Sequence, residues 1–226
     1  MILHNQYGIK VAGSTIAHHF QKRGTSRLYR YKRVNHHKKR YAMANPLERV
    51  QTDTSWSGYE DNYGRYLYFI PVIDDCTRVV TVHVATSKSS IDAVDSFYKF
   101  TEKFGRPEVV QTDNGVEFTT KYISVENVRR EKPPTYSAFE QEIDFLKIRH
   151  AKISKGTPEL NGKVERFNST IKNAMQNRLY NGITLELAQR IVDDWVDWYN
   201  KIKPHASLKR MTPYQKFYGV QLAKPA

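Results

Sequence analysis

Three acidic residues stand in short phrases whose residue types suit metal chemistry. Asp53 lies in QTDTSW, Asp113 in VVQTDNGVEF and Glu165 in TPELNGKVERFNSTIK. Carboxylate oxygens are good ligands for Mg²⁺ or Mn²⁺, and two such ions can clamp the attacking and leaving oxygens of a phosphodiester. The phrases therefore predict a centre in which Asp53, Asp113 and Glu165 are the metal ligands and the catalytic carboxylates.

The charge balance predicts a polyanionic partner. The 226 residues carry a formal net charge of +13, from 36 Lys and Arg against 23 Asp and Glu. A basic chain of this size most often binds nucleic acid; a ribosome, an anionic membrane or simple solubility are the alternatives. Bound divalent cations would allow an acidic centre to accept such a polyanion. The single cysteine, Cys76, excludes an internal disulfide framework and argues against a Cys-rich zinc site.

The sequence gives no sign of export or of a membrane span. Residues 1–8 lack a basic start followed by an apolar stretch, and no segment approaches about 18 consecutive apolar residues. We therefore expect a cytoplasmic, nucleoid-associated protein without a membrane partner.

Residues 1–45 form a basic segment whose composition differs from the rest. A short helix is expected over 14–22, which fits either the second helix of a helix-turn-helix or an ordinary amphipathic helix. The stretch RLYRYKRVNHHKKRYAMANP then interleaves basic and aromatic residues. It suits either a strap on nucleic acid or a solvated linker. We expect this segment to be a partial helix-turn-helix remnant.

From residue 47 the pattern predicts an α/β fold with a mixed five-stranded sheet flanked by helices. Strands are expected over 49–55, 65–73, 79–85, 108–111 and 148–153. Helices are expected over 89–104, 138–146, 160–180 and 185–201. Residues 183–226 are expected to form a C-terminal helix and a basic tail that pack on this core.

The order of the elements places two of the carboxylates at strand ends. Asp53 lies near the end of the first strand, and Asp113 lies just past the fourth. Strand ends at a topological switch point border the crevice in which open α/β sheets bind ligands. Glu165 lies on the long helix, which could cross that edge and complete the centre.

Four more residues of the long helix are candidates for DNA contacts. Ser169 and Lys172 follow Glu165 at i+4 and i+7, so they share its face and Lys172 could meet a phosphate of the strand being cut. Lys163 and Arg166 flank that face and could contact the duplex further out. A solvated helix face is the alternative for these residues.

Three other acids compete for the same chemistry. Asp74 and Asp75 are expected to cap or shape a turn. Glu117 is expected either to support the metal ligands from behind or to be a surface residue.

The three phrases together resemble the integrase catalytic core of bacterial insertion-sequence transposases and retroviral integrases. The resemblance covers about residues 45–219, and its most specific pieces are DNG-x-EF at 113–118 and NGKVERFN at 161–168. IDDCTR lies between the first two phrases, and YN-x-x-x-PH-x-SL at 199–208 is typical of the bacterial transposases. The family's fold is ribonuclease-H-like, and its Asp-Asp-Glu triad falls on Asp53, Asp113 and Glu165.

The resemblance implies that residues 46–182 are an integrase catalytic core. A DDE-type polynucleotidyl transferase of this kind would use two Mg²⁺ or Mn²⁺ ions to cleave DNA 3′ ends and transfer them during transposition. Its partners would be double-stranded transposon ends and target DNA, bound by a homodimer or higher oligomer. A hydrolytic nuclease on the same fold and a truncated, non-catalytic DNA-binding transposase remnant are the alternatives.

Two features depart from the family pattern. Between Asp113 and Glu165 lie 51 residues, more than the family commonly has. The excess is expected between Lys121 and Glu142, where a loop insertion costs little entropy. Related transposases also usually carry a fuller helix-turn-helix region than the one expected here.

Overall fold

The computed structural model describes residues 8, 11–23, 42–120, 136–153 and 161–219. The chain divides into two compact units, residues 1–41 and 42–226. The expected basic strap, most of the expected insertion and the start of the expected long helix lie wholly or partly outside the described residues. No helix in the described ranges is long and apolar enough to cross a membrane.

The first unit contributes one described helix, α2 (Gly13–Lys22). The sequence predicts a helix over 14–22, and the structure confirms it. His19 and Lys22 lie in its last turn. The helix dipole makes a positive charge, such as that of Lys22, favourable at this end.

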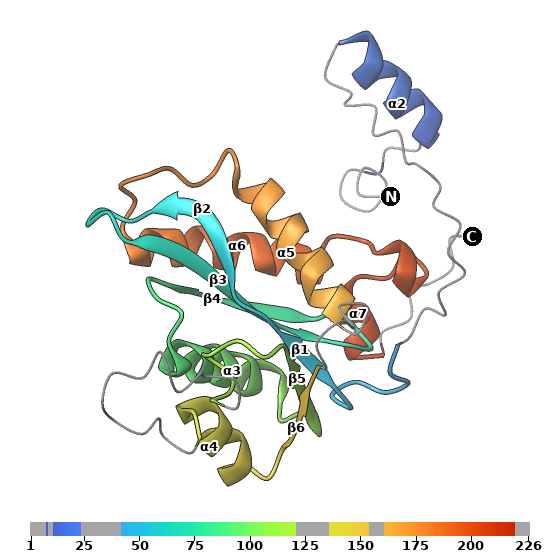
Figure 1. Ribbon diagram of the computed structural model, residues 1–226. Coiled ribbons are helices and arrows are strands. Elements are labelled where there is room, and N and C mark those ends of the chain that lie inside the picture. The colour runs from blue at the N-terminus through green and yellow to red at the C-terminus, as the bar shows by residue number, and fades with distance from the viewer. Residues whose placement is uncertain (1–7, 9–10, 24–41, 121–135, 154–160, 220–226) are drawn as a thin grey trace. The chain divides into compact units, whose positions relative to one another are not determined.

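The described residues of the second unit form six strands and the helices that flank them (Figure 1). The strands are β1 (Val50–Thr52), β2 (Ser55–Glu60), β3 (Tyr66–Asp74), β4 (Val80–Ala85), β5 (Val109–Thr112) and β6 (Arg149–Lys152). The helices are α3 (Ser90–Phe104), α4 (Ala138–Phe145), α5 (Gly162–Met175), α6 (Leu185–Lys201), the 3₁₀ turn η3 (Ala206–Leu208) and α7 (Pro213–Phe217).

The sheet is mixed, as the sequence predicts. β3 pairs antiparallel with β1, β2 and β4, whereas β5 pairs parallel with both β1 and β6. The order is β2-β3-β1-β5-β6, with β4 also paired to β3. The carboxyl ends of β1 and β5 therefore reach the same edge of the sheet.

The expected count of five strands is wrong, because the segment expected as one strand over 49–55 divides into β1 and the start of β2. Thr52 pairs with Val72, and Ser55 pairs with Phe69, in one continuous register along β3. Carrying that register across the gap sets Asp53 opposite Pro71. Proline has no backbone N–H to donate, so the ladder is interrupted at this point.

Each face of the sheet carries its own hydrophobic core. On one face, β3 and β4 pack against α5 and α6, with Phe167, Ile171 and Val192 fully or nearly fully buried. On the other face, α3 and α4 pack against the sheet, with Phe97 and Phe139 buried. Figure 1 shows α5 and α6 on one side of the strands and α3 and α4 on the other.

Local signals set several helix ends. Ser89 caps α3 by accepting a hydrogen bond from the Asp92 amide, and Gly105, with φ 96°, ends it. Helix α6 has the bounds that the sequence predicts, 185–201. Helix α5 is described only from Gly162 to Met175, shorter than the expected 160–180.

Candidate metal centre

Asp53 lies at the break between β1 and β2. Pro71 opposite it cannot donate a hydrogen bond to the ladder, so the pairing is interrupted here, and the half-buried Asp53 directly follows the last residue of β1. Asn168 of α5 donates a hydrogen bond from Nδ2 to Asp53 Oδ2 at 2.9 Å. This bond fixes the direction of one carboxylate oxygen and links the strand end to the helix.

Asp113 follows β5, the parallel neighbour of β1. Val50 pairs with Val110 and Gln51 with Gln111, so the two strands end beside each other. The pKa of Asp53 is raised to about 6, first by burial and then by the negative charge of Asp113; Glu117 adds to the rise. The two carboxylates predicted at strand ends are therefore close enough to repel each other.

Three hydrogen bonds stabilise the start of the loop after β5. Gly115 N–H donates to Asp113 Oδ1 at 2.9 Å, and Thr112 Oγ1 donates to the Asp113 carbonyl at 2.7 Å. Asn114 Nδ2 reaches across to the Ile153 carbonyl, just past β6, at 2.7 Å. The Asp113 side chain is exposed, so its second oxygen remains available to a ligand.

Helix α5 crosses the carboxyl end of β1 and carries Glu165. The Val164 N–H donates to Gln51 Oε1 at 3.3 Å, and Asn168 reaches Asp53 one turn further on. Glu165 precedes Asn168 by three residues, so the two lie on the same side of the helix. Glu165 is exposed.

Asn168 is the site residue that the sequence did not single out. The i, i+3 spacing from Glu165 within NGKVERFN could have indicated it, because a polar side chain one turn from a candidate ligand faces the same site.

The four candidate DNA contacts differ in their surroundings. Lys163 forms an ion pair with Asp75, and its side chain is only 16% exposed. Arg166 and Ser169 are exposed, and Lys172 is partly buried. Ser169 Oγ donates to the Glu165 carbonyl at 3.2 Å. Contact with DNA stays a prediction for all four, and Lys163 already has a structural role.

Asp74 is the last residue of β3 and Asp75 begins the turn that follows, so both shape this turn, as expected. The fully buried Asp74 accepts hydrogen bonds from the backbone of Leu47 at 2.9 Å and Thr77 at 2.7 Å, and from the Thr77 hydroxyl at 2.6 Å. Asp75, also fully buried, pairs with Arg78 and Lys163. Their hydrogen bonds and ion pairs explain these two acids without a metal.

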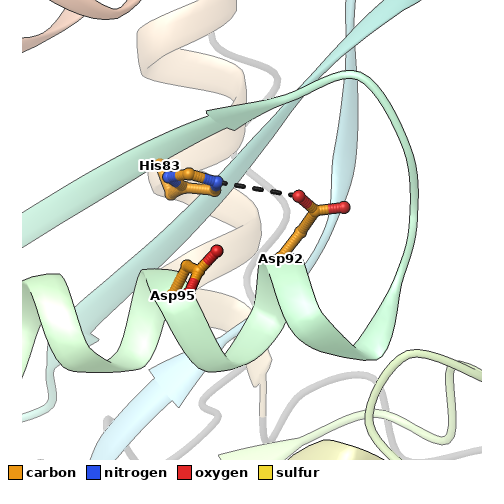
Figure 2. A group of neighbouring side chains, drawn as sticks. All are labelled: His83, Asp92 and Asp95. Atoms are coloured by element: carbon orange, nitrogen blue, oxygen red, sulfur yellow. Dashed lines mark ion pairs between the residues drawn. The ribbon is translucent and has the colours of Figure 1, made fainter.

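A second group of metal-ligating side chains lies away from this centre. His83 of β4 faces Asp92 and Asp95 of α3, as Figure 2 shows. Within the described residues, it is the group of three whose ligand atoms all lie within 4.8 Å. Hydrogen bonds at the start of α3 account for the position of Asp92 in this group. Asp92 Oδ2 accepts a hydrogen bond from Ser87 Oγ at 2.5 Å and another from Ser89 Oγ at 2.6 Å.

Asp53, Asp113 and Glu165 are not drawn as tightly together as that group, among the described residues. The negative charges of Asp113 and Glu117 add to the raised pKa of Asp53, as expected of carboxylates that repel one another. Carboxylates on two strand ends and one helix fit an oxygen-liganded divalent ion, which would offset that repulsion.

The raised pKa of Asp53 predicts how the stability of the metal-free protein depends on pH. The folded state binds the proton of the Asp53 carboxyl more tightly than the unfolded chain does. The resulting stabilisation is therefore full below pH 3.8 and is lost as the pH rises through about 6. Besides burial, the groups that shift the pKa of Asp53 are Asp113, Glu117, Asn168 and the Thr54 amide.

Denaturation in EDTA should reveal this dependence of stability on pH. From pH 3.8 to about 6, the unfolding free energy of the wild type should fall relative to that of Asp53→Asn. A constant difference between the two proteins over this interval would contradict the assignment. Excess Mg²⁺ should remove the trend, because a bound cation favours the ionised carboxylate.

Comparison with known families identifies the fold. Residues 44–158 match a family described as integrase core domain, and residues 146–213 match a second family of the same description. The first match alone covers just over half of the chain. This chain therefore belongs to the integrase core domain family.

Relatives and solved structures agree with that membership. The chain is 28% identical over 155 residues to the insertion element IS476 uncharacterized 39.2 kDa protein of Xanthomonas euvesicatoria, covering 67% of this chain and 39% of that protein. It thus spans well under half of that relative's length.

Two retroviral structures share the architecture. The HTLV-2 integrase catalytic core domain in complex with magnesium gives a TM-score of 0.54 at 19% identity, covering 77% of this chain and 98% of that one. The simian T-cell lymphotropic virus intasome in complex with PP2A regulatory subunit B56 gamma gives 0.60 at 19% identity, covering 82% and 61%. The predicted ribonuclease-H-like fold class is confirmed, with six strands in place of five.

Proposed function

We propose that this chain catalyses divalent-metal-dependent cleavage of DNA 3′ ends and their transfer into a target strand during transposition. The observation that carries the proposal is the pair Asp53 and Asp113, which repel each other at the ends of adjacent parallel strands beneath the helix that carries Glu165. The net charge of +13 supports a polyanionic substrate.

Asp53, Asp113 and Glu165 would hold the metal, with carboxylate oxygens that match Mg²⁺ or Mn²⁺. When bound, two such ions supply Lewis-acid activation of the attacking oxygen and charge stabilisation at the leaving 3′-oxygen. Asn168 holds Asp53 in its orientation through the 2.9 Å hydrogen bond. This chemistry needs no covalent enzyme intermediate, so no nucleophilic side chain is required.

The exposed Arg166 and Ser169, together with Lys172, would contact phosphates next to the centre. Such contacts position the duplex without reading its sequence. The HTLV-2 core is described in dimeric and trimeric forms. We propose that this chain likewise acts as a dimer or higher oligomer, because joining two DNA ends requires two positioned ends.

A joining assay tests the proposal. Labelled duplexes from the DNA that flanks the coding sequence are incubated with the protein, a supercoiled plasmid and Mg²⁺. We expect the label to become covalently attached to the plasmid, and EDTA to prevent this. Cutting without joining would indicate a nuclease, and binding without either reaction would indicate a DNA-binding remnant.

A further inference from the structure

Glu117 is a buried acid with no described partner. It is 7% exposed and lies in the loop after β5, next to Phe118, which is fully buried. Within the described residues, no hydrogen bond or ion pair to its carboxylate is found. The Phe118 and Thr119 amides both donate to the Gly115 carbonyl at 3.0 Å, and this tight turn folds Glu117 back over Gly115.

The Glu117 carboxylate points toward the same space as Asp113. A Cβ placed on Gly115 would lie 2.7 Å from Glu117 Oε2 and 3.1 Å from Asp113 Oδ1. The two carboxylates therefore lie around one glycine, whose missing side chain leaves them room. Asp53 is near enough to both that their negative charges raise its pKa.

Three acids thus converge where the described residues supply no cation to them. Burying a carboxylate without a partner is unfavourable, and like charges at short range add to the cost. Such an arrangement persists when the structure is built to receive a positive ion. A turn-shaping role alone does not explain it, because the Gly115 turn is closed by backbone hydrogen bonds.

We propose that Glu117 is a fourth acidic member of the metal centre, a carboxylate partner of the divalent ion that Asp53 and Asp113 share. This rests on the proposed function for the existence of that ion. It adds a residue that the Asp-Asp-Glu pattern does not include. The chemical class of the ligand is a hard divalent cation, Mg²⁺ or Mn²⁺.

Titration of the metal-free protein with Mn²⁺ alone tests the proposal, followed by calorimetry or by electron paramagnetic resonance. Glu117→Gln removes the charge and keeps the shape. We expect its Mn²⁺ affinity to be roughly 10- to 100-fold weaker than that of the wild type. In EDTA its thermal midpoint should equal or exceed that of the wild type, because one repelling charge is gone.

Three comparison variants make the outcome specific. Asp95→Asn removes an exposed carboxylate from the His83 group and should leave Mn²⁺ affinity unchanged. Gly115→Ala should weaken Mn²⁺ binding as Glu117→Gln does, because the new Cβ displaces the Glu117 carboxylate. Asp53→Asn changes a carboxylate of the proposed centre itself and should also weaken Mn²⁺ binding.

Different results separate the two proposals. Wild-type Mn²⁺ affinity in Glu117→Gln with weak binding in Asp53→Asn would overturn the role of Glu117 and leave the proposed function standing. Wild-type affinity in both would overturn both. A lower thermal midpoint in EDTA with unchanged affinity would make Glu117 a structural residue. Loss of binding in Asp95→Asn alone would place the ion at His83.

Discussion

Replacing Asp53 or Asp113 with Asn, or Glu165 with Gln, will abolish Mg²⁺-dependent strand transfer and leave DNA binding largely intact. Each change removes one negative charge from the proposed metal centre and conserves the size of the side chain. We expect the rate to fall by about a thousandfold or more, because metal stabilisation of the transition state is worth several kcal/mol and each ~1.4 kcal/mol is tenfold.

The joining assay and a DNA-binding titration at the same salt concentration measure the two halves of this prediction. Asp95→Asn is the matched control, because it removes an exposed carboxylate outside the centre. Full strand transfer in any one of the three variants would remove that residue from the assignment. Loss of DNA binding in parallel with activity would instead indicate damage to the fold.

Replacing Asp75 with Ala will destabilise the fold by about 3–5 kcal/mol, the range for breaking a buried ion pair by removing one partner. Asp75 is fully buried and pairs with Lys163, 16% exposed, and Arg78, 14% exposed. Without it, two largely buried cations lose a common counter-charge. Lys163 lies in the first turn of α5, so the loss also loosens the helix two residues before Glu165.

Urea denaturation, with Asp197→Ala as the control, measures this effect. Asp197 pairs with Lys103 at 2.9 Å and Lys201 at 2.7 Å, but its side chain is 41% exposed. A solvent-screened pair of this kind is worth about 0–1 kcal/mol. If Asp75→Ala costs no more than Asp197→Ala, the buried ion pair does not anchor α5.

Much of the frame was predictable because local signals and tertiary contacts agree. The apolar run over 65–73 forms β3, and Ser89 and Gly105 bound α3 as their capping chemistry dictates. The amphipathic pattern over 185–201 forms α6 with the expected bounds. Trp198 of that pattern is nevertheless exposed, unlike the buried Trp195 and Tyr199, because only one face of the helix meets the sheet.

The strand division at Asp53 was not predictable from the strand itself. SWSGYE has two serines and a glycine, which are weak strand formers, and its pairing comes from β3. The interruption depends on Pro71, distant in sequence and set opposite Asp53 only by the register.

The sequence alone determined the identity and order of the acidic phrases at Asp53, Asp113 and Glu165, because residue type and flanking pattern are local properties. Only the tertiary structure decided which charges face each other. It turned Lys163 toward Asp75, brought Asn168 to Asp53 and buried Glu117 beside Asp113. Such pairings depend on the packing of α5 and of the loop after β5 against the sheet edge, which no single segment encodes.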